Sequence, residues 1–223
     1  MYDFYSVVWF AISCILVRML YEVVDAILRR SPCIHSYGRL PLHRRLYVQK
    51  NVVKAVYLFL LVCVAICTIA RQIYFDNVWD NYQIHRLAVL YVSNDFTGLV
   101  CVPQLSTTTL AHHTVSTILV FVSLSLDFQE SDIGQAMLVY TLASASSYLV
   151  NCYLGLRLLF RKSALLRLRQ VAAAIYVFTC GASWLWHAIW VCRRESWTLS
   201  HAMYLLLLCF IVRDDLVLMQ WLL

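Results

Sequence analysis

Long apolar runs, separated by short clusters of charge, constrain this chain more than any other feature. The sequence is 62% hydrophobic and only 13% charged, a composition typical of an integral membrane protein. A helix needs roughly 20 mostly apolar residues to cross the hydrocarbon core of a bilayer. Because lipid offers no hydrogen bonds to an exposed backbone, such runs must form helices. The sequence therefore predicts an all-α protein, a polytopic membrane helical bundle.

The apolar runs predict about seven transmembrane helices. The last run is followed by Arg213-Asp214-Asp215 and an apolar tail. We divide the chain into residues 1–49, a first transmembrane helix with a basic loop, and residues 50–223, a six-helix membrane domain. The predicted spans are residues 2–21, 52–70, 87–102, 107–126, 133–156, 171–192 and 197–212.

Positive charge is concentrated in two segments, residues 29–50 and 157–169. Loops on the cytosolic side of a membrane carry an excess of Lys and Arg. We therefore expect both segments to be cytosolic, with the N-terminus outside or lumenal, the C-terminus cytosolic and the acidic loop 127–132 outside. Arg193-Arg194 runs against this orientation. The net charge of +6 follows from the basic loops, and no basic patch with interleaved aromatic residues indicates nucleic-acid binding.

Asp95, His112 and His113 are the candidate catalytic residues. They place one carboxylate and two adjacent imidazoles inside predicted spans. An Asp at the centre of a bilayer costs about 2.5–3.5 kcal/mol on insertion scales, so such a group is usually functional and faces a bundle interior or a wet cavity.

Polar side chains recur at helical spacing along four of the predicted spans. Residues three and four apart share one face of a helix, and polar faces in a membrane are best hidden against one another. We therefore expect them to surround one polar central cavity. The alternative is that individual hydroxyl groups only bridge helices or bond to their own backbone carbonyls. The residues expected to line the cavity or bind lipid are Tyr91, Thr109, Ser116, Tyr140, Ser144, Ser147, Asn151, Tyr176, Ser183 and His187.

Neither a metal nor a cofactor is expected. Adjacent residues such as His112 and His113 point about 100° apart on a helix, and the sequence offers no third ligand at a useful spacing. The nine cysteines lie mostly in apolar runs, without a C-x-x-C pattern, which indicates buried apolar side chains.

The order of these polar residues resembles the TLC domain, the fold shared by ceramide synthases and by less understood lipid-linked membrane proteins. The similar features are Tyr91-x-x-x-Asp95, a His-His pair early in the next span, an acidic loop, and then Ser144-x-x-Ser147 before Tyr-Leu. They cover about residues 50–220. The resemblance implies a location in the endoplasmic reticulum or another internal membrane. It also implies membrane lipids as partners, with fatty acyl chains or sphingoid bases as candidate ligands; homo-oligomer formation stays open.

Two carboxylates of the ceramide synthase site are absent. In those enzymes the two histidines, which match His112 and His113, work with two aspartates where this chain has Ser144 and Ser147. A carboxylate orients an imidazole and stabilises its cation, which serine cannot do. The resemblance therefore favours the non-synthase members, and we expect a protein that binds lipid and influences membrane lipid composition.

Two alternatives remain open. In the first, Asp95 supplies the missing charge, and His112 and His113 transfer a fatty acyl group from acyl-CoA to an amine. Asp95→Asn would then reduce turnover while leaving the fold largely intact. In the second, Asp95, the histidine pair and Arg213-Asp214-Asp215 form a transporter or a proton or ion pathway.

Overall fold

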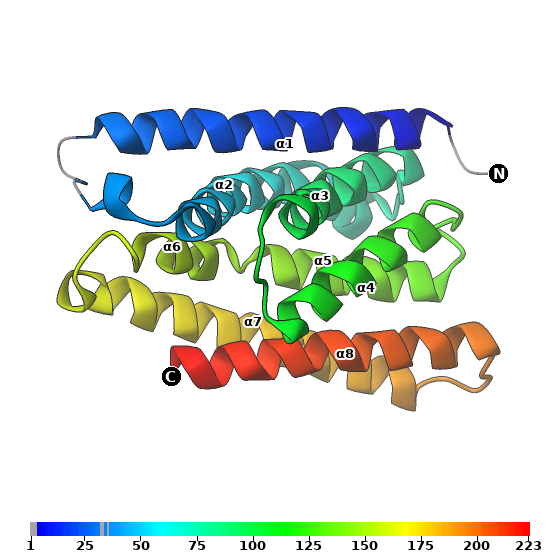
Figure 1. Ribbon diagram of the computed structural model, residues 1–223. Helices are drawn as coiled ribbons and strands as arrows, with labels where there is room; N and C mark the ends of the chain where they lie inside the picture. The colour runs from blue at the N-terminus through cyan, green and yellow to red at the C-terminus, as the bar shows by residue number, and fades with distance from the viewer. Residues whose placement is uncertain (1–3, 32–33, 35) are drawn as a thin grey trace.

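The computed structural model describes residues 4–31, 34 and 36–223, and this part of the chain is all helical, as predicted (Figure 1). Helices α5 and α6 are separated only by Ser146 and Ser147, so the eight α-helices form seven rods. The helices are α1 (Phe4–Arg30), α2 (Leu42–Ala65), α3 (Asn81–Cys101), α4 (Thr107–Ser123), α5 (Asp132–Ala145), α6 (Tyr148–Leu156), α7 (Leu166–Cys192) and α8 (Leu199–Leu222).

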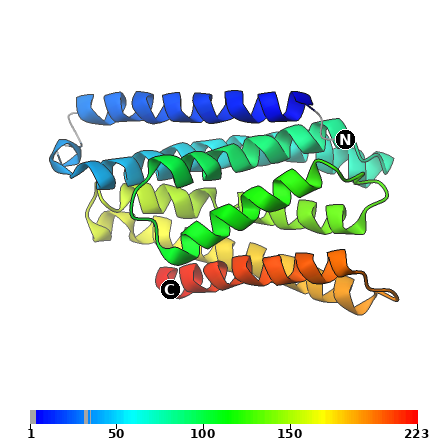
Figure 2. The same cartoon turned by 45° about the vertical axis from the view of Figure 1, so that its right-hand side comes forward.

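Consecutive rods run in opposite directions and pack side by side (Figure 1). α1 covers one side of the bundle, α7 and α8 form the opposite side, and the other helices lie between them. Figure 2 shows the same layering from a second direction. The main long-range contacts pair α2 with α6, α1 with α3, and α4 with α8. This packing brings α8 beside the consecutive helices α2, α3 and α4, although α8 lies far from them in sequence.

Four helical segments are long and apolar enough to cross a membrane: Tyr5–Arg30, Leu42–Asp76, Asp132–Leu156 and Lys162–Cys192. The prediction of a multi-pass helical membrane protein agrees with these four segments. The remaining rods are α3, α4 and α8. They are shorter or more polar, since α4 has 17 residues and α8 carries three charged residues in its middle.

Helix α2 begins ten residues before the predicted span 52–70. It starts after Pro41 and continues through π-helical turns, Ile66–Ala70 and Gln72–Asp76. Lys50, assigned to the basic loop by its charge, is therefore a buried helical residue. The division at residues 49 and 50 falls inside α2. The first predicted span began at residue 2, which lies outside the described residues, and α1 continues beyond residue 21 to Arg30.

The two basic loops lie at the same end of the bundle, whereas loop 127–132 lies at the other end (Figure 1). Ser36 Oγ donates a hydrogen bond of 3.3 Å to the backbone oxygen of Leu159. Tyr37 and Leu159 also belong to one apolar cluster that ties the two loops together. The assignment of this end to the cytosol stays a prediction.

Candidate functional site

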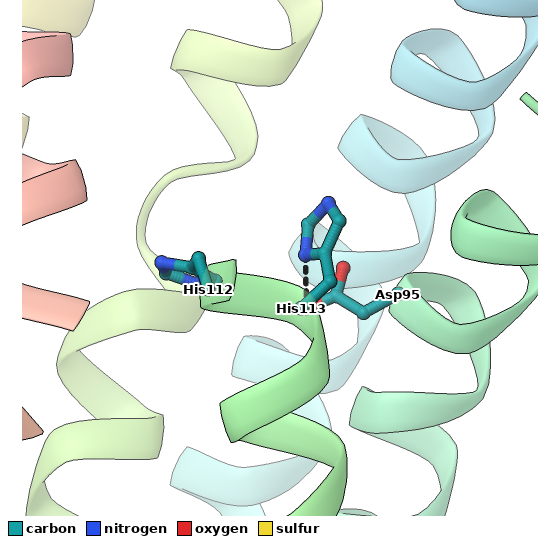
Figure 3. Close-up of side chains that lie close together, drawn as sticks. All are labelled: Asp95, His112 and His113. Atoms are coloured by element: carbon teal, nitrogen blue, oxygen red, sulfur yellow. Dashed lines mark ion pairs between the residues drawn. The ribbon is translucent and has the colours of Figure 1, made fainter. Parts of the chain in front are cut away.

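Asp95 lies near the middle of α3 and has 0% of its surface exposed. Its Oδ1 accepts a hydrogen bond from the Lys54 ammonium of α2. Its Oδ2 lies 3.2 Å from Nδ1 of His113 on α4. Figure 3 shows the His113 ring directed at this carboxylate. Asp95 therefore joins three helices through two ionisable partners.

Lys50 completes the contacts of the His113 ring. Its Nζ lies 3.0 Å from Nε2 of His113. An ammonium group only donates hydrogen bonds, so we assign Nε2 as the acceptor and the ring hydrogen to Nδ1, the nitrogen that lies nearer Asp95. Gly98 leaves space for the lysine, because a Cβ at that position would lie 3.0 Å from Lys50 Cε. The Lys50 amine, the His113 imidazole and the Asp95 carboxylate therefore lie in that order, with the imidazole between the other two.

His112 points away from His113 and reaches a different helix. The two rings are 5.5 Å apart, with an interplanar angle of 88° (Figure 3). Nδ1 of His112 lies 3.2 Å from Oδ2 of Asp214 on α8. The neighbouring Asp215 accepts hydrogen bonds from Tyr140 and Tyr176, at 3.1 and 2.7 Å. Each histidine therefore faces its own carboxylate.

The start of α4 is fixed by local sequence signals. Ser106 accepts a hydrogen bond of 3.2 Å from the Thr109 backbone N–H, which caps the helix. Val102, before Pro103, has the extended conformation that a residue preceding proline prefers. The short turn between α3 and α4 holds the histidine pair one and a half turns inside α4, next to Asp95.

A polar pocket lies against both histidines. Its space amounts to about 1310 Å³, part of which is open to the surroundings. Arg157 and residues of loop 102–106 contribute to its lining at the end that carries the basic loops. Seven residues predicted from the sequence line it: Thr109, His112, His113, Ser144, Ser147, Asn151 and Tyr176.

A second pocket is almost entirely apolar. Its space amounts to about 870 Å³, again partly open, between residues of α2, α3, α4, α5 and α8. Three predicted residues, Tyr91, Ser116 and Tyr140, line this pocket instead of the polar one. Tyr91 Oη lies 2.8 Å from Oγ of Ser144, which lines the polar pocket, so the two pockets adjoin at this contact.

Ser183 and His187 line neither of these pockets. His187 has its ring nitrogens within hydrogen-bond distance of the Ser183 backbone oxygen, at 2.7 Å, and of Tyr204 Oη, at 2.9 Å. Both residues share the predicted polar face of α7 with Tyr176, but only Tyr176 reaches the polar pocket. His187 is therefore a core histidine with satisfied nitrogens.

Sequence reasoning missed three charged residues of this candidate site: Lys50, Lys54 and the Asp214 partner of His112. The lysines are four residues apart and so share a helix face, a spacing that is visible in the sequence. The charge of Lys50 was instead attributed to membrane orientation, and Lys54, inside the second predicted span, was given no role. Asp214 was considered only for a relay, because no local pattern connects α8 to α4.

Asp95, His112 and His113 offer ligand atoms that lie within 4.8 Å of one another. Asp95, which comes from α3, is therefore a third potential metal ligand. Residue spacing along α4 alone could not reveal it. However, Lys54 already holds Asp95, and Lys50 contacts the nitrogen of His113. Two amines beside the cluster would repel a divalent cation, so the arrangement favours an ion-pair and proton-transfer network.

Among known proteins, no family model, curated sequence or solved structure matches this chain. The function of the site therefore has to be inferred from its own geometry and chemistry.

Proposed function

We propose that this chain is a TLC-like membrane protein with about seven spanning helices that binds a membrane lipid beside its histidine pair. The observation that carries the proposal is the contact between Tyr91 and Ser144, where a polar pocket adjoins an apolar one. A lipid has one polar and one apolar end. A polar pocket next to an apolar one suits such a ligand, because each end of the lipid moves from the bilayer into a pocket of similar polarity.

The polar pocket suits a head group that accepts hydrogen bonds. Lys50, Lys54 and Arg157 contribute donors to its lining, and Asp214 contributes an acceptor. Arg157 stacks on Trp221, with 4.4 Å from its guanidinium carbon to the ring centroid. The TLC resemblance supports an internal membrane such as the endoplasmic reticulum, with fatty acyl chains or sphingoid bases as ligands and membrane lipid composition as the property affected.

Lipid identification on the purified protein tests this proposal. Ala88 lines the apolar pocket, whereas Ala182 lies exposed on α7. Ala88→Phe should fill the pocket and lower the amount of co-purified lipid measured by mass spectrometry, and Ala182→Phe should not. Equal lipid content in the wild type and in Ala88→Phe would show that this pocket does not hold the lipid.

A second candidate function is fatty-acyl transfer, and the contact between His112 and Asp214 favours it. The absence of carboxylates at Ser144 and Ser147 weighed against such chemistry, but Asp214 and Asp95 lie beside the imidazoles from other helices. In this reaction Nε2 of His112 takes the proton of an attacking amine. The new C–N bond replaces the C–S bond of the thioester, and the proton passes to the departing thiolate.

An assay in proteoliposomes with fatty acyl-CoA and a sphingoid base tests the second candidate. Wild-type protein should form the amide, and His112→Ala should abolish its formation. If the wild-type protein retains lipid but forms no amide, acyl transfer is rejected while lipid binding stands.

A further inference from the structure

Lys50 combines burial with an unusual partner. It is 4% exposed, and its Nζ contacts Nε2 of His113 at 3.0 Å. Lys54, one helical turn away, is instead paired with the carboxylate of Asp95. Among the described residues, no carboxylate lies within ion-pair distance of Lys50. Asp95 pairs with Lys54 and His113, and Asp214 lies beside His112. The two lysines therefore have different chemical settings.

Lys50, His113 and Asp95 have the arrangement of a nucleophile, its base and the group that orients the base. Such triads are recognised by a nucleophile and a base within hydrogen-bond reach, with a third group holding the base. His113 presents Nε2 to the amine and Nδ1 to Asp95, at 3.0 and 3.2 Å. A lysine amine is also activated when it is desolvated beside another cation. For Lys50, the neighbouring cation is Lys54.

The Lys50 amine can also meet a ligand, since Lys50 and His113 both line the polar pocket. We propose that Lys50 is a catalytic nucleophile that forms a Schiff base with the carbonyl of a long-chain lipid aldehyde bound in this pocket. The inference rests on the lipid-binding function proposed above and names a substrate class for that site. An aldehyde fits better than a thioester, because acylation of Lys50 would leave a stable amide and end turnover.

The chemistry balances without an oxidant or a reductant. His113 Nε2 takes a proton from the Lys50 ammonium, and the free amine attacks the aldehyde carbon, forming a C–N bond. The attacking nitrogen passes one of its own protons to the carbonyl oxygen, which becomes a hydroxyl group. His113 then returns its proton to that hydroxyl, which leaves as water as the C=N bond forms. Asp95, held by Lys54, stabilises the imidazolium while it carries the proton.

Reductive trapping on the full chain in detergent tests the proposal, with hexadecanal as the probe and sodium cyanoborohydride as the reductant. The chain has lysines only at positions 50, 54 and 162, and Lys162, exposed at the start of the 3-10 helix Lys162–Leu165, serves as an internal control. Peptide mass spectrometry should find the reduced adduct on Lys50 and little on Lys54 or Lys162. Lys50→Arg should remove it, and Lys162→Arg should leave it unchanged.

The pH dependence of the trapping rate shows whether His113 acts as a general base, because a purely structural role would not alter it. His113→Gln should lower the initial trapping rate at neutral pH by about a hundredfold, the usual scale of general-base catalysis. Raising the pH should restore the rate, because hydroxide then removes the ammonium proton. The charged and titratable groups around Lys50 are Lys54, Asp95, Asp214 and His113. The melting temperature of each variant shows whether it is folded.

Four results would overturn the inference. Equal labelling of Lys50 and Lys162 would show that the buried amine has no special reactivity. A stable acyl group on Lys50 without reductant would replace the Schiff base with acyl chemistry. An adduct with propanal but none with hexadecanal would exclude the lipid aldehyde. Lipid retained by wild-type protein that gives no adduct also rejects the Schiff base, but leaves the proposed lipid binding intact.

Discussion

Nδ1 of His112 lies 3.2 Å from Oδ2 of Asp214, so a histidine of α4 is paired with a carboxylate from α8. The sequence-based comparison looked for this carboxylate at Ser144 and Ser147. The bundle instead brings it from a helix about a hundred residues beyond His112 in the chain. The effect on the imidazole is the same, because a carboxylate on Nδ1 orients the ring and stabilises its cation wherever it originates.

Asp214→Asn tests the catalytic value of this pair. The amide keeps the shape of the side chain but removes its charge, so we expect acyl transfer, if present in the wild type, to fall by about a hundredfold or more. Turnover in proteoliposomes measures the effect. Glu130→Gln is the control, since Glu130 is an exposed residue of the loop between α4 and α5. Unchanged turnover in a folded Asp214→Asn protein would remove the pair from the mechanism.

The buried pair of Lys54 and Asp95 is expected to control stability. Removing one member of a buried ion pair typically costs about 3–5 kcal/mol, because the other charge stays buried without a partner. Asp95→Asn should therefore lower the melting temperature in detergent, contrary to the sequence-based expectation of an intact fold. Lys54→Met should have a similar effect, and the double variant should recover part of the loss. Additive losses in the double variant would contradict this coupling.

The sequence was informative wherever a property depends on one helix. Composition predicted an all-α protein, and Asp95 and His113 were identified because ionisable groups are rare in spans. Contacts between helices were not predictable, because helical spacing gives the face on which a residue lies but not the face it meets. Thus His187 shares a stripe with Tyr176, yet its ring packs with Tyr204.

Charge misled the sequence-based boundary of α2. Arg44, Arg45 and Lys50 precede the most apolar part of the segment, which suggested a loop before residue 52. Helix α2 includes all three residues. A bundle can bury Lys50 and Lys54 because α3 and α4 supply a carboxylate and an imidazole as partners. The required partners lie too far along the chain to be recognised by local spacing.

The loops that contain Arg39 and Arg161 should share one side of the membrane, which we expect to be the cytosol. The hydrogen bond from Ser36 to Leu159 places the two loops at one end of the bundle. Short epitope tags inserted after Arg39, after Arg161 and after Glu130 can be tested with antibodies before and after membrane permeabilisation. The first two tags should respond alike and the Glu130 tag oppositely. Opposite responses of the first two would exclude the proposed orientation.

Asp127 should make stability depend on pH at the opposite end of the bundle. A hydrogen bond of 2.9 Å from the Asn81 amide and another from the Gln129 backbone hold the pKa of this carboxyl below its usual range. The ionised form is therefore favoured in the folded state. Its contribution is present above the unfolded-state pKa, near 4, and is lost as the pH falls through the lower folded-state pKa.

Comparison of Asp127→Asn with the wild type measures this contribution. The wild type should melt at a higher temperature than the variant at neutral pH, and the difference should narrow as the pH is lowered below about 4. A difference that does not change with pH would show that the charge of Asp127 is not responsible.

Gly155 and Gly181 form a matched pair for testing the packing of α6 against α2. A Cβ on Gly155 would lie 2.9 Å from a methyl carbon of Val52 and 3.2 Å from its backbone nitrogen, whereas a Cβ on Gly181 of α7 would meet nothing within 4 Å. Gly155→Ala must therefore push α6 away from α2, and overpacking of this kind costs about 1–3 kcal/mol. Gly181→Ala should be neutral or stabilising, because alanine favours a helix by up to about 1 kcal/mol over glycine.

Thermal unfolding of the two glycine variants in the same detergent separates these effects. We expect a lower melting temperature for Gly155→Ala and an equal or higher one for Gly181→Ala. Because α2 carries Lys50 and Lys54, the displacement in Gly155→Ala should also reduce lipid retention. Equal melting temperatures for the two variants would mean that α6 and α2 are packed less closely than the distances to Val52 require.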